Sequence, residues 1–299
     1  MSSAATIYLG LDVHKESVTI AVLPSGALAP TRVDKLPNDL AKLRRFCERQ
    51  ASQGTVRACY EASGAGYVIQ RAMTAWGYHC DVIAPSLIPI KPGQQRKHDS
   101  YDAAQLARLY RAGELTVVRI PTEAEERVRD VVRCRETFQR EVLRSRHYIL
   151  KFLARRGFVY REGTPWRQAH YEWLRRLAAA SSPLAPEDRQ VFGEYLGLLE
   201  YKLSRRDALD EQIEALALTP ALASAVATLQ CFRGIQQQAA MVLATEISDW
   251  QRFASPRQLM AYLGLVPREH SSGDRERRGS LTKAGNTHCR HVLVQAAWA

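Results

Sequence analysis

The chain has 299 residues, of which 46% are hydrophobic and 24% charged, a balance typical of a folded protein with room for two domains. It contains no apolar run of the roughly 18 residues that a membrane helix needs, and its first residues lack a signal peptide's basic segment, so we expect a cytoplasmic protein without membrane contact. The net charge of +11 indicates a polyanionic partner, and we expect nucleic acid.

The positive charge is concentrated in the middle of the chain. Between Arg127 and Arg176 there are thirteen Arg and one Lys against five acidic residues, although three glutamates lie just before this window. We expect the nucleic-acid contacts to come from this region and from a basic stretch near the end of the chain, through Arg144, Lys151, Arg155, Arg156, Arg275, Arg277, Arg278 and Lys283. The six cysteines are scattered without a paired spacing, which predicts small buried side chains rather than a metal or redox motif.

Short apolar strands and amphipathic helices alternate in the first third of the chain. Two strands joined by a turn are followed by strands that alternate with helices, which predicts an α/β domain with a mixed sheet over residues 1–118. This order fits a ribonuclease-H-like arrangement. The predicted strands are 7–12, 18–23, 55–61 and 80–85, and the predicted helices are 40–47, one ending at 76, and 99–110.

The rest of the chain is predicted to be helical. A helix over 123–158 carries an approximate heptad seam with polar breaks at Arg135 and Ser145, a shorter helix spans 166–180, and a second long helix passes through 191–216. Residues 119–217 therefore predict a coiled coil, antiparallel or dimerising, with an ordinary helical bundle as the alternative. Residues 218–299 predict a small all-α domain with helices at 222–229, 239–247, 256–262 and from 282, and a polar loop at 268–279.

Four acids occupy positions suited to a divalent metal. Asp12 and Glu61 each end a predicted strand, and Asp99 and Asp102, three residues apart, share one face at the start of a helix. Carboxylate oxygens are the ligands that Mg²⁺ prefers, and such a site can perform phosphodiester chemistry. The alternative for Asp99 and Asp102 is a helix-capping role alone, because acids favour helix N-termini.

A second candidate lies in the polar loop near the end of the chain. Ser271 and Ser272 precede Gly273, and the arginines that follow could hold a phosphate beside an exposed hydroxyl. The alternative is a basic phosphate-binding loop whose serines do not react. A zinc site from His288, Cys289 and His291 with Cys231 or His270 is disfavoured, because the spacing matches no standard zinc pattern.

Several motifs together resemble the DEDD transposases of insertion sequences. The three acidic motifs correspond to Gly10-Leu11-Asp12-Val13-His14-Lys15, Tyr60-Glu61-Ala62-Ser63-Gly64 and Lys97-His98-Asp99-Ser100-Tyr101-Asp102-Ala103. The family's C-terminal transposase domain is similar to Arg252-Phe253, Ala261-Tyr262-Leu263-Gly264-Leu265-Val266-Pro267, Ser271-Ser272-Gly273 and Thr282-Lys283-Ala284-Gly285-Asn286. The motifs occur in the family's order at both ends of the chain.

The resemblance implies an RNA-guided DNA recombinase that acts on donor and target DNA. It implies that Asp12, Glu61, Asp99 and Asp102 bind Mg²⁺, and that Ser272, with Ser271 as the alternative, attacks a DNA phosphate to form a phosphoserine link. It also implies a structured non-coding guide RNA, and a homodimer or tetramer whose active sites combine the acidic domain of one subunit with the serine domain of another.

Two other functional classes stay open on the sequence. A metal-dependent nuclease or Holliday-junction resolvase would use water as the nucleophile, and a non-catalytic nucleic-acid-binding relic would use neither the acids nor the serine. The presence of all four acids argues against the relic. A sugar kinase, suggested by the strand that ends at Asp12, is excluded because the later phosphate-binding glycine loops are missing.

Overall fold

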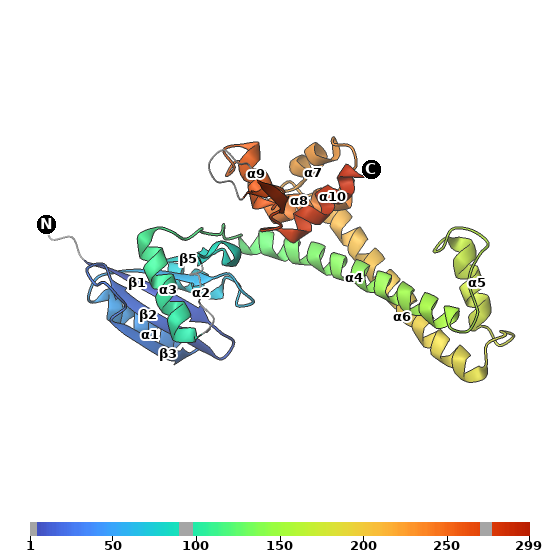
Figure 1. Ribbon diagram of the computed structural model, residues 1–299, viewed down its shortest axis with the longest axis horizontal. Helices are drawn as coiled ribbons and strands as arrows, with labels where there is room; N and C mark the ends of the chain where they lie inside the picture. Colours follow the sequence, from blue (N-terminus) through green and yellow to red (C-terminus); the bar gives the residue numbers. More distant parts are fainter. Residues whose placement is uncertain (1–4, 90–97, 270–276) are drawn as a thin grey trace. The chain divides into compact units, whose positions relative to one another are not determined.

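The structure is a computed structural model that describes residues 5–89, 98–269 and 277–299 (Figure 1). The chain divides into two compact units, Met1–Ile120 and Pro121–Ala299. The first unit corresponds closely to the predicted α/β domain, whereas the predicted regions 119–217 and 218–299 together make up the second. Within the described residues, no helix has the length and apolar character to cross a membrane.

A five-stranded mixed sheet forms the centre of the first unit. Its strands are β1 (Thr6–Val13), β2 (Ser17–Pro24), β3 (Arg32–Pro37), β4 (Thr55–Glu61) and β5 (His79–Ile83), in the spatial order β3-β2-β1-β4-β5. The pairs β1–β2 and β2–β3 are antiparallel, and β4 pairs in parallel with both β1 and β5. This is the expected ribonuclease-H-like arrangement, with β3 as an edge strand that the sequence analysis did not predict.

Helices cover both faces of this sheet. Helices α1 (Leu40–Ala51) and α2 (Val68–Ala75) pack against the alternate β1 residues Ile7, Leu9 and Leu11. The other face, which includes Tyr8 and Gly10, packs against α3 (Asp99–Ala112), and a short 3₁₀ turn, η1 (Pro85–Leu87), follows β5. Because side chains alternate along a strand, Asp12 belongs to the face that α3 covers.

Two long antiparallel helices form the central part of the second unit. Helix α4 (Glu123–Ala154) packs along α6 (Pro186–Ala217), and α5 (Gln168–Ala178) lies between them in the chain. The predicted polar breaks in the seam are both paired across it. Arg135 Nε donates to Asp210 at 2.7 Å, and Lys202 Nζ donates to Ser145 Oγ at 3.1 Å. The pairing occurs within one chain and stabilises the antiparallel arrangement.

The C-terminal part of this unit is built around the buried helix α8 (Gln237–Ile247). Its other helices are α7 (Ala223–Gln230), α9 (Pro256–Tyr262) and α10 (Thr287–Ala297), and a hairpin of β6 (Pro267–Glu269) and β7 (Arg278–Leu281) adds two short strands. The sequence analysis predicted a polar loop where this hairpin lies, and it placed the start of the last helix five residues too early, at 282.

Candidate active site

One row of residues crosses the sheet on the face that α3 covers. Strand register pairs Lys35 on β3 with Thr19 on β2, and Thr19 with Asp12 on β1. Leu11 pairs with Tyr60 of the parallel strand β4, so the next residues, Asp12 and Glu61, end neighbouring strands at the same edge. The two acids that the sequence places at strand ends therefore lie on neighbouring strands.

Glycine at position 10 lets α3 approach this row. A Cβ atom at Gly10 would overlap the backbone carbonyl oxygen of Ala103 and the backbone nitrogen of Ala107. The close packing of α3 on β1 therefore requires the absence of a side chain two residues before Asp12. It places the first residue of α3, Asp99, beside the end of β1.

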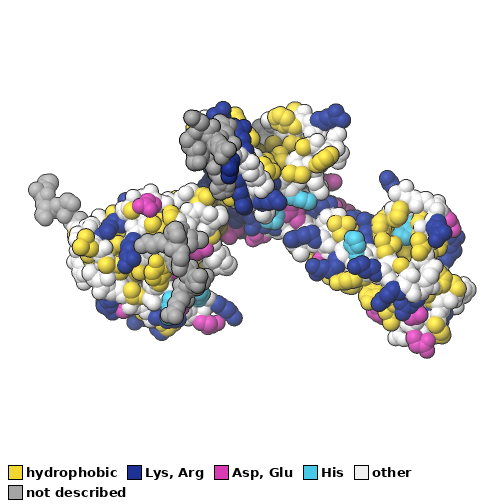
Figure 2. Space-filling model, in the orientation of Figure 1, with side chains coloured by type: hydrophobic (Ala, Val, Ile, Leu, Met, Phe, Trp, Pro, Cys, Tyr) yellow, Lys and Arg dark blue, Asp and Glu magenta, His cyan; other side chains and the backbone are white. Residues whose placement is uncertain are grey.

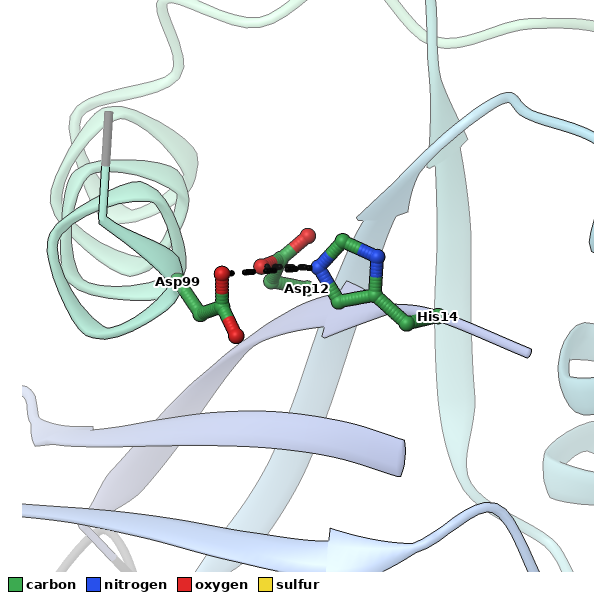
Figure 3. A group of neighbouring side chains, drawn as sticks. All are labelled: Asp12, His14 and Asp99. Atoms are coloured by element: carbon green, nitrogen blue, oxygen red, sulfur yellow. Dashed lines mark hydrogen bonds and ion pairs between the residues drawn. The ribbon is translucent and has the colours of Figure 1, made fainter. Parts of the chain in front are cut away.

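Asp12, His14 and Asp99 form one compact group (Figure 3). His14 Nε2 lies 3.0 Å from Asp12 Oδ2 and 3.6 Å from Asp99 Oδ1, and one ligand atom from each of the three residues lies within 4.8 Å of the others. Lys35 Nζ donates to Asp99 Oδ2 at 3.0 Å. Two carboxylates from elements far apart in the sequence thus meet around two basic side chains.

The surroundings shift the pKa values of the two carboxyl groups in opposite directions. Burial raises the pKa of Asp12, and the negative charges of Asp99 and Asp102 add to this effect, while the hydrogen bond and charge of His14 oppose it. The hydrogen bond from Lys35 lowers the pKa of Asp99. Asp12 is therefore a partly buried acid whose ionised form gains from a nearby cation.

The donor set fits a hard divalent cation. Carboxylate oxygens dominate the group, and an imidazole nitrogen adjoins them, which suits Mg²⁺ or Mn²⁺ better than a soft metal. The Thr19 hydroxyl, on the strand position paired with Asp12, is buried and has no hydrogen-bond partner among the described residues. An unsatisfied buried oxygen beside ionisable carboxylates is consistent with a site that receives a hydrated ion.

Asp102 and Glu61 flank this group without joining it. Asp102 lies in the first turn of α3, near enough for its charge to affect Asp12, and Glu61 is exposed at the end of β4. Asp99 and Asp102 both lie in the first turn of α3, the position that the helix-terminus alternative also requires, and the Asp99 carboxylate additionally pairs with Lys35. Among the described residues, the group that could hold a metal ion contains two of the four predicted acids, together with His14.

The sequence analysis missed His14 and Lys35 as members of this site. His14 stands two residues after Asp12 in the same motif, and strand alternation would have placed both side chains on one face. No comparable signal identifies Lys35, because its strand is exposed and lacks an apolar run.

The serine loop lies only partly within the described residues. Ser271, Ser272 and Arg275 lie outside them, whereas β6 and β7, which flank this segment, form an antiparallel hairpin in which Glu269 pairs with Arg278. Arg277 and Arg278 are exposed, and Lys283, with φ of +54°, donates its backbone N–H to Gly264 O at 3.2 Å.

Two crossing backbone segments hold the base of this hairpin. A Cβ atom at Gly264 would overlap the carbonyl oxygen of Ala284, and one at Gly285 would overlap that of Tyr262, so both positions require glycine. Arg290 Nη1 joins the same segments by donating to Leu263 O at 2.9 Å and to Ala284 O at 3.2 Å. The predicted Lys283–Asn286 motif therefore packs against residues 262–264 at the base of the β6–β7 hairpin, which flanks the serine loop.

The histidines and cysteines near the end of the chain differ in their surroundings. His288 Nδ1 hydrogen-bonds to Glu136 Oε2, and Cys289 is buried. Cys231 is exposed at the C-cap of α7. Of the residues named for a zinc site, His270 lies outside the described residues.

The predicted basic contacts on α4 differ in their surroundings. Arg156 donates to Asp188 and lies over the Phe152 ring, and Arg144 pairs with Glu141 at 2.8 Å. Lys151 and Arg155 are exposed, and no acidic side chain pairs with them in the described part of the chain. The last two residues are therefore the ones whose charge is open to a ligand.

Two family models and several named proteins are similar to this chain. Residues 9–156 match the family model of the DEDD transposase domain, and residues 226–299 match that of the transposase IS116/IS110/IS902 family. The y4qE protein of Sinorhizobium fredii, whose name describes it as a transposase, is 35% identical over 97% of this chain and 71% of its own length.

Two further relatives are named as transposases of insertion sequence elements. That of IS1533 from Leptospira borgpetersenii is 27% identical over 98% of this chain and 84% of its own length. That of IS1111A from Coxiella burnetii is 25% identical over 97% and 77%. The acids on β1 and α3 lie inside the first matched domain, and the serine hairpin lies inside the second. The chain belongs to the IS110/IS116 family of insertion-sequence transposases, enzymes that act on DNA in transposition.

Proposed function

We propose that this transposase is a Mg²⁺-dependent, RNA-guided recombinase that cuts and exchanges DNA strands through a covalent phosphoserine intermediate. The observation that carries the proposal is the meeting of Asp12 and Asp99 with His14 at one edge of the sheet. Asp12, Asp99, Asp102 and Glu61 would hold the metal, which supplies Lewis-acid stabilisation of charge at a phosphate. Lys35 balances the charge of Asp99 in the protein alone.

The proposed nucleophile is the Ser272 hydroxyl, with Ser271 as the alternative. The serine oxygen forms a bond to a DNA phosphorus and loses its proton. The phosphorus–oxygen bond to the neighbouring nucleotide breaks, and the departing oxygen takes up a proton to become a free hydroxyl. Reversal with a hydroxyl from another strand rejoins the DNA and releases the serine. Because each step exchanges one phosphoester for another, the strands can be joined without an outside energy source.

Variants of the serine and the acid separate this mechanism from hydrolysis. With Ser272→Ala, we expect loss of both strand joining and the protein–DNA adduct that resists denaturation, whereas Ser280→Ala, a change at an exposed β7 serine, retains both. A metal nuclease that uses water would keep cutting DNA after Ser272→Ala. Asp12→Asn is expected to abolish cleavage. If wild type and Asp12→Asn bind DNA equally well and cannot be distinguished in any DNA assay, the non-catalytic relic would be supported.

The proposal includes a guide RNA and an active site shared between subunits. The net charge of +11, with thirteen Arg and one Lys against five acids between Arg127 and Arg176, supplies the electrostatic attraction that RNA and DNA backbones require. Purified protein should carry one discrete structured RNA, and random fragments would contradict guiding. Mixing Asp12→Asn with Ser272→Ala subunits should restore strand joining in a dimer or tetramer with composite sites, and it should restore nothing if each subunit acts alone.

A further inference from the structure

An aromatic groove lies on the exposed surface between the C-terminal end of α4 and the N-terminal half of α6. The groove has a volume of about 500 Å³ and is lined by Tyr148, Lys151, Phe152, Ala154, Arg155 and Tyr195. Two phenol rings and two long cationic side chains thus share one depression. Lys and Arg side chains also gather along the visible surface of the α4–α6 pair (Figure 2).

The floor of this groove is a rigid stack of aromatic rings. Phe152 lies parallel to Phe192 on α6 with 6.2 Å between ring centroids, and it meets the Tyr195 ring edge-on at 5.5 Å. The guanidinium of Arg156 covers the Phe152 ring at 3.6 Å and pairs with Asp188, which fixes the stack between the two helices. Arg156 therefore supports the groove through its contacts with Phe152 and Asp188.

The wall of the groove presents one face of α4. Tyr148, Lys151 and Arg155 follow one another at i, i+3 and i+7, so they lie on one side of the helix within about 10 Å. The Tyr148 side chain is 46% exposed, and its ring lies 6.1 Å from that of Tyr195 at a tilt of 38°. Among the described residues, no acidic side chain pairs with Lys151 or Arg155. An exposed ring beside two such cations is suited to a flat, negatively charged ligand.

We propose that this groove binds single-stranded nucleic acid, with a base stacked on Tyr148 and Tyr195 and the adjoining phosphates held by Lys151 and Arg155. Unpaired bases expose the ring faces that stack on aromatic side chains, whereas duplex bases stack on one another and leave only phosphates to contact. Charge favours this ligand over an uncharged or basic segment, because residues 140–156 hold six Arg and Lys against one acid. The biological role of the groove rests on the proposed RNA-guided function, but its chemistry does not.

The test measures binding of short labelled oligouridylate and oligothymidylate strands, and of a duplex of equal length, to the full chain. The measurement uses fluorescence anisotropy, with Asp12→Asn protein in EDTA so that no cleavage occurs. Tyr148→Ala should weaken single-strand binding about tenfold, while Tyr148→Phe keeps it and duplex binding changes by less than about twofold. Tyr201→Ala, which removes a 60% exposed ring of α6 outside the groove, is the matched control.

The contribution of Lys151 and Arg155 is measured by the salt dependence of the binding affinity. The double variant Lys151→Gln, Arg155→Gln should reduce the slope of log affinity against log salt by about 1.4 for single strands, because each lost phosphate contact removes about 0.7. The RNA and DNA probes distinguish which strand the groove prefers. The proposal is overturned if Tyr148→Ala behaves like Tyr201→Ala, if single strand and duplex weaken equally, or if polyglutamate competes as well as an oligonucleotide.

Failure here is distinguishable from failure of the recombinase proposal. Strand joining that survives Ser272→Ala would remove the recombinase mechanism and leave Tyr148-dependent binding intact. Conversely, loss of the Tyr148 effect would remove the groove and leave the serine chemistry untouched.

Discussion

Lys35 Nζ lies 3.0 Å from Asp99 Oδ2, although 64 residues separate the two in the chain. The contact arises because Lys35, Thr19 and Asp12 share one row of the sheet and α3 begins above that row. Among the described residues, this ammonium and the imidazole of His14 both contact the acids. The Lys35 charge would therefore compete with a divalent cation for the Asp99 carboxylate.

Removing this ammonium should strengthen metal binding. In Lys35→Met the pKa of Asp99 rises toward its ordinary value, but Asp99 no longer has a cation that competes with the metal. We expect the affinity for Mn²⁺ at neutral pH to increase about twofold or more, a modest change because both side chains are partly exposed. Isothermal titration calorimetry measures it directly.

The matched control for this change is Lys42→Met on α1. Lys42 is exposed, and its helix packs on the opposite face of the sheet from α3, so the same loss of charge occurs away from the acids. Weaker Mn²⁺ binding in Lys35→Met than in the control would mean that Lys35 positions Asp99 rather than competing for it.

Gly10→Ala should disturb the site through the backbone. The added methyl group would overlap α3 at Ala103 and Ala107, so the helix must move away from β1 and carry Asp99 with it. We expect a loss of about 1–3 kcal/mol in the free energy of unfolding and of metal-dependent thermal stabilisation. Gly26→Ala, where a Cβ meets no atom within 4 Å, should leave both unchanged. An active, stable Gly10→Ala protein would show that α3 does not need this approach.

Asp12→Asn should stabilise the metal-free fold while it abolishes its response to metal. Burial raises the pKa of Asp12, so its ionisation opposes folding as the pH rises through the folded-state pKa. The amide avoids that cost near neutral pH, and it cannot supply an anionic ligand. Thermal unfolding with and without Mn²⁺ measures both effects. A variant that is less stable without metal and still stabilised by Mn²⁺ would contradict this assignment.

The acids could be predicted from the sequence because their positions follow from local rules. Two apolar strands each end in an acid, and a pair of acids lies at the start of a helix. These features indicate acids that gather at one edge of a sheet. Strand register then places Asp12 and Glu61 at the ends of neighbouring strands, and the glycine two residues before Asp12 admits α3. Glu61 nevertheless stays outside the group of Asp12, His14 and Asp99.

Lys35 and the serine hairpin could not be predicted in the same way. Residues 32–37 form an edge strand that is largely exposed, so their sequence lacks the apolar alternation that identifies strands. The described residues of β6 and β7 are all exposed, and backbone pairing rather than side-chain burial defines this hairpin. In the long helices, the heptad seam predicted a partner helix, but Arg135–Asp210 and Ser145–Lys202 identify it as α6 of the same chain.

An ion pair between the buried Glu246 and the partly exposed Arg133 links α4 to the part of the chain that supports the β6–β7 hairpin. Arg133 donates through Nε and Nη2 to the two oxygens of Glu246 on α8, at 2.6 and 2.8 Å, and Asn286 Nδ2 donates to Glu246 Oε2 at 2.6 Å. Asn286 in turn caps α10 by accepting from the backbone N–H of Cys289. Burial raises the pKa of Glu246, but the hydrogen bonds from Arg133 and Asn286 and the charges of Arg133 and His288 together outweigh burial, so the pKa is lowered.

Glu246→Gln should therefore lower the free energy of unfolding of the second unit by about 2–3 kcal/mol. This loss is smaller than that expected on breaking a fully buried ion pair, because Arg133 is 41% exposed. Since the folded-state pKa lies below the unfolded value of 4.5, the stabilisation by Glu246 is present above that pH and is lost as the pH falls through the folded pKa. Urea unfolding from neutral pH down to acid should show that the gap between wild type and Glu246→Gln narrows below about pH 4.5. Glu214→Gln, at an exposed position of α6, should show no such gap at any pH. A gap that persists unchanged into acid would mean that the amide disturbs packing rather than charge pairing.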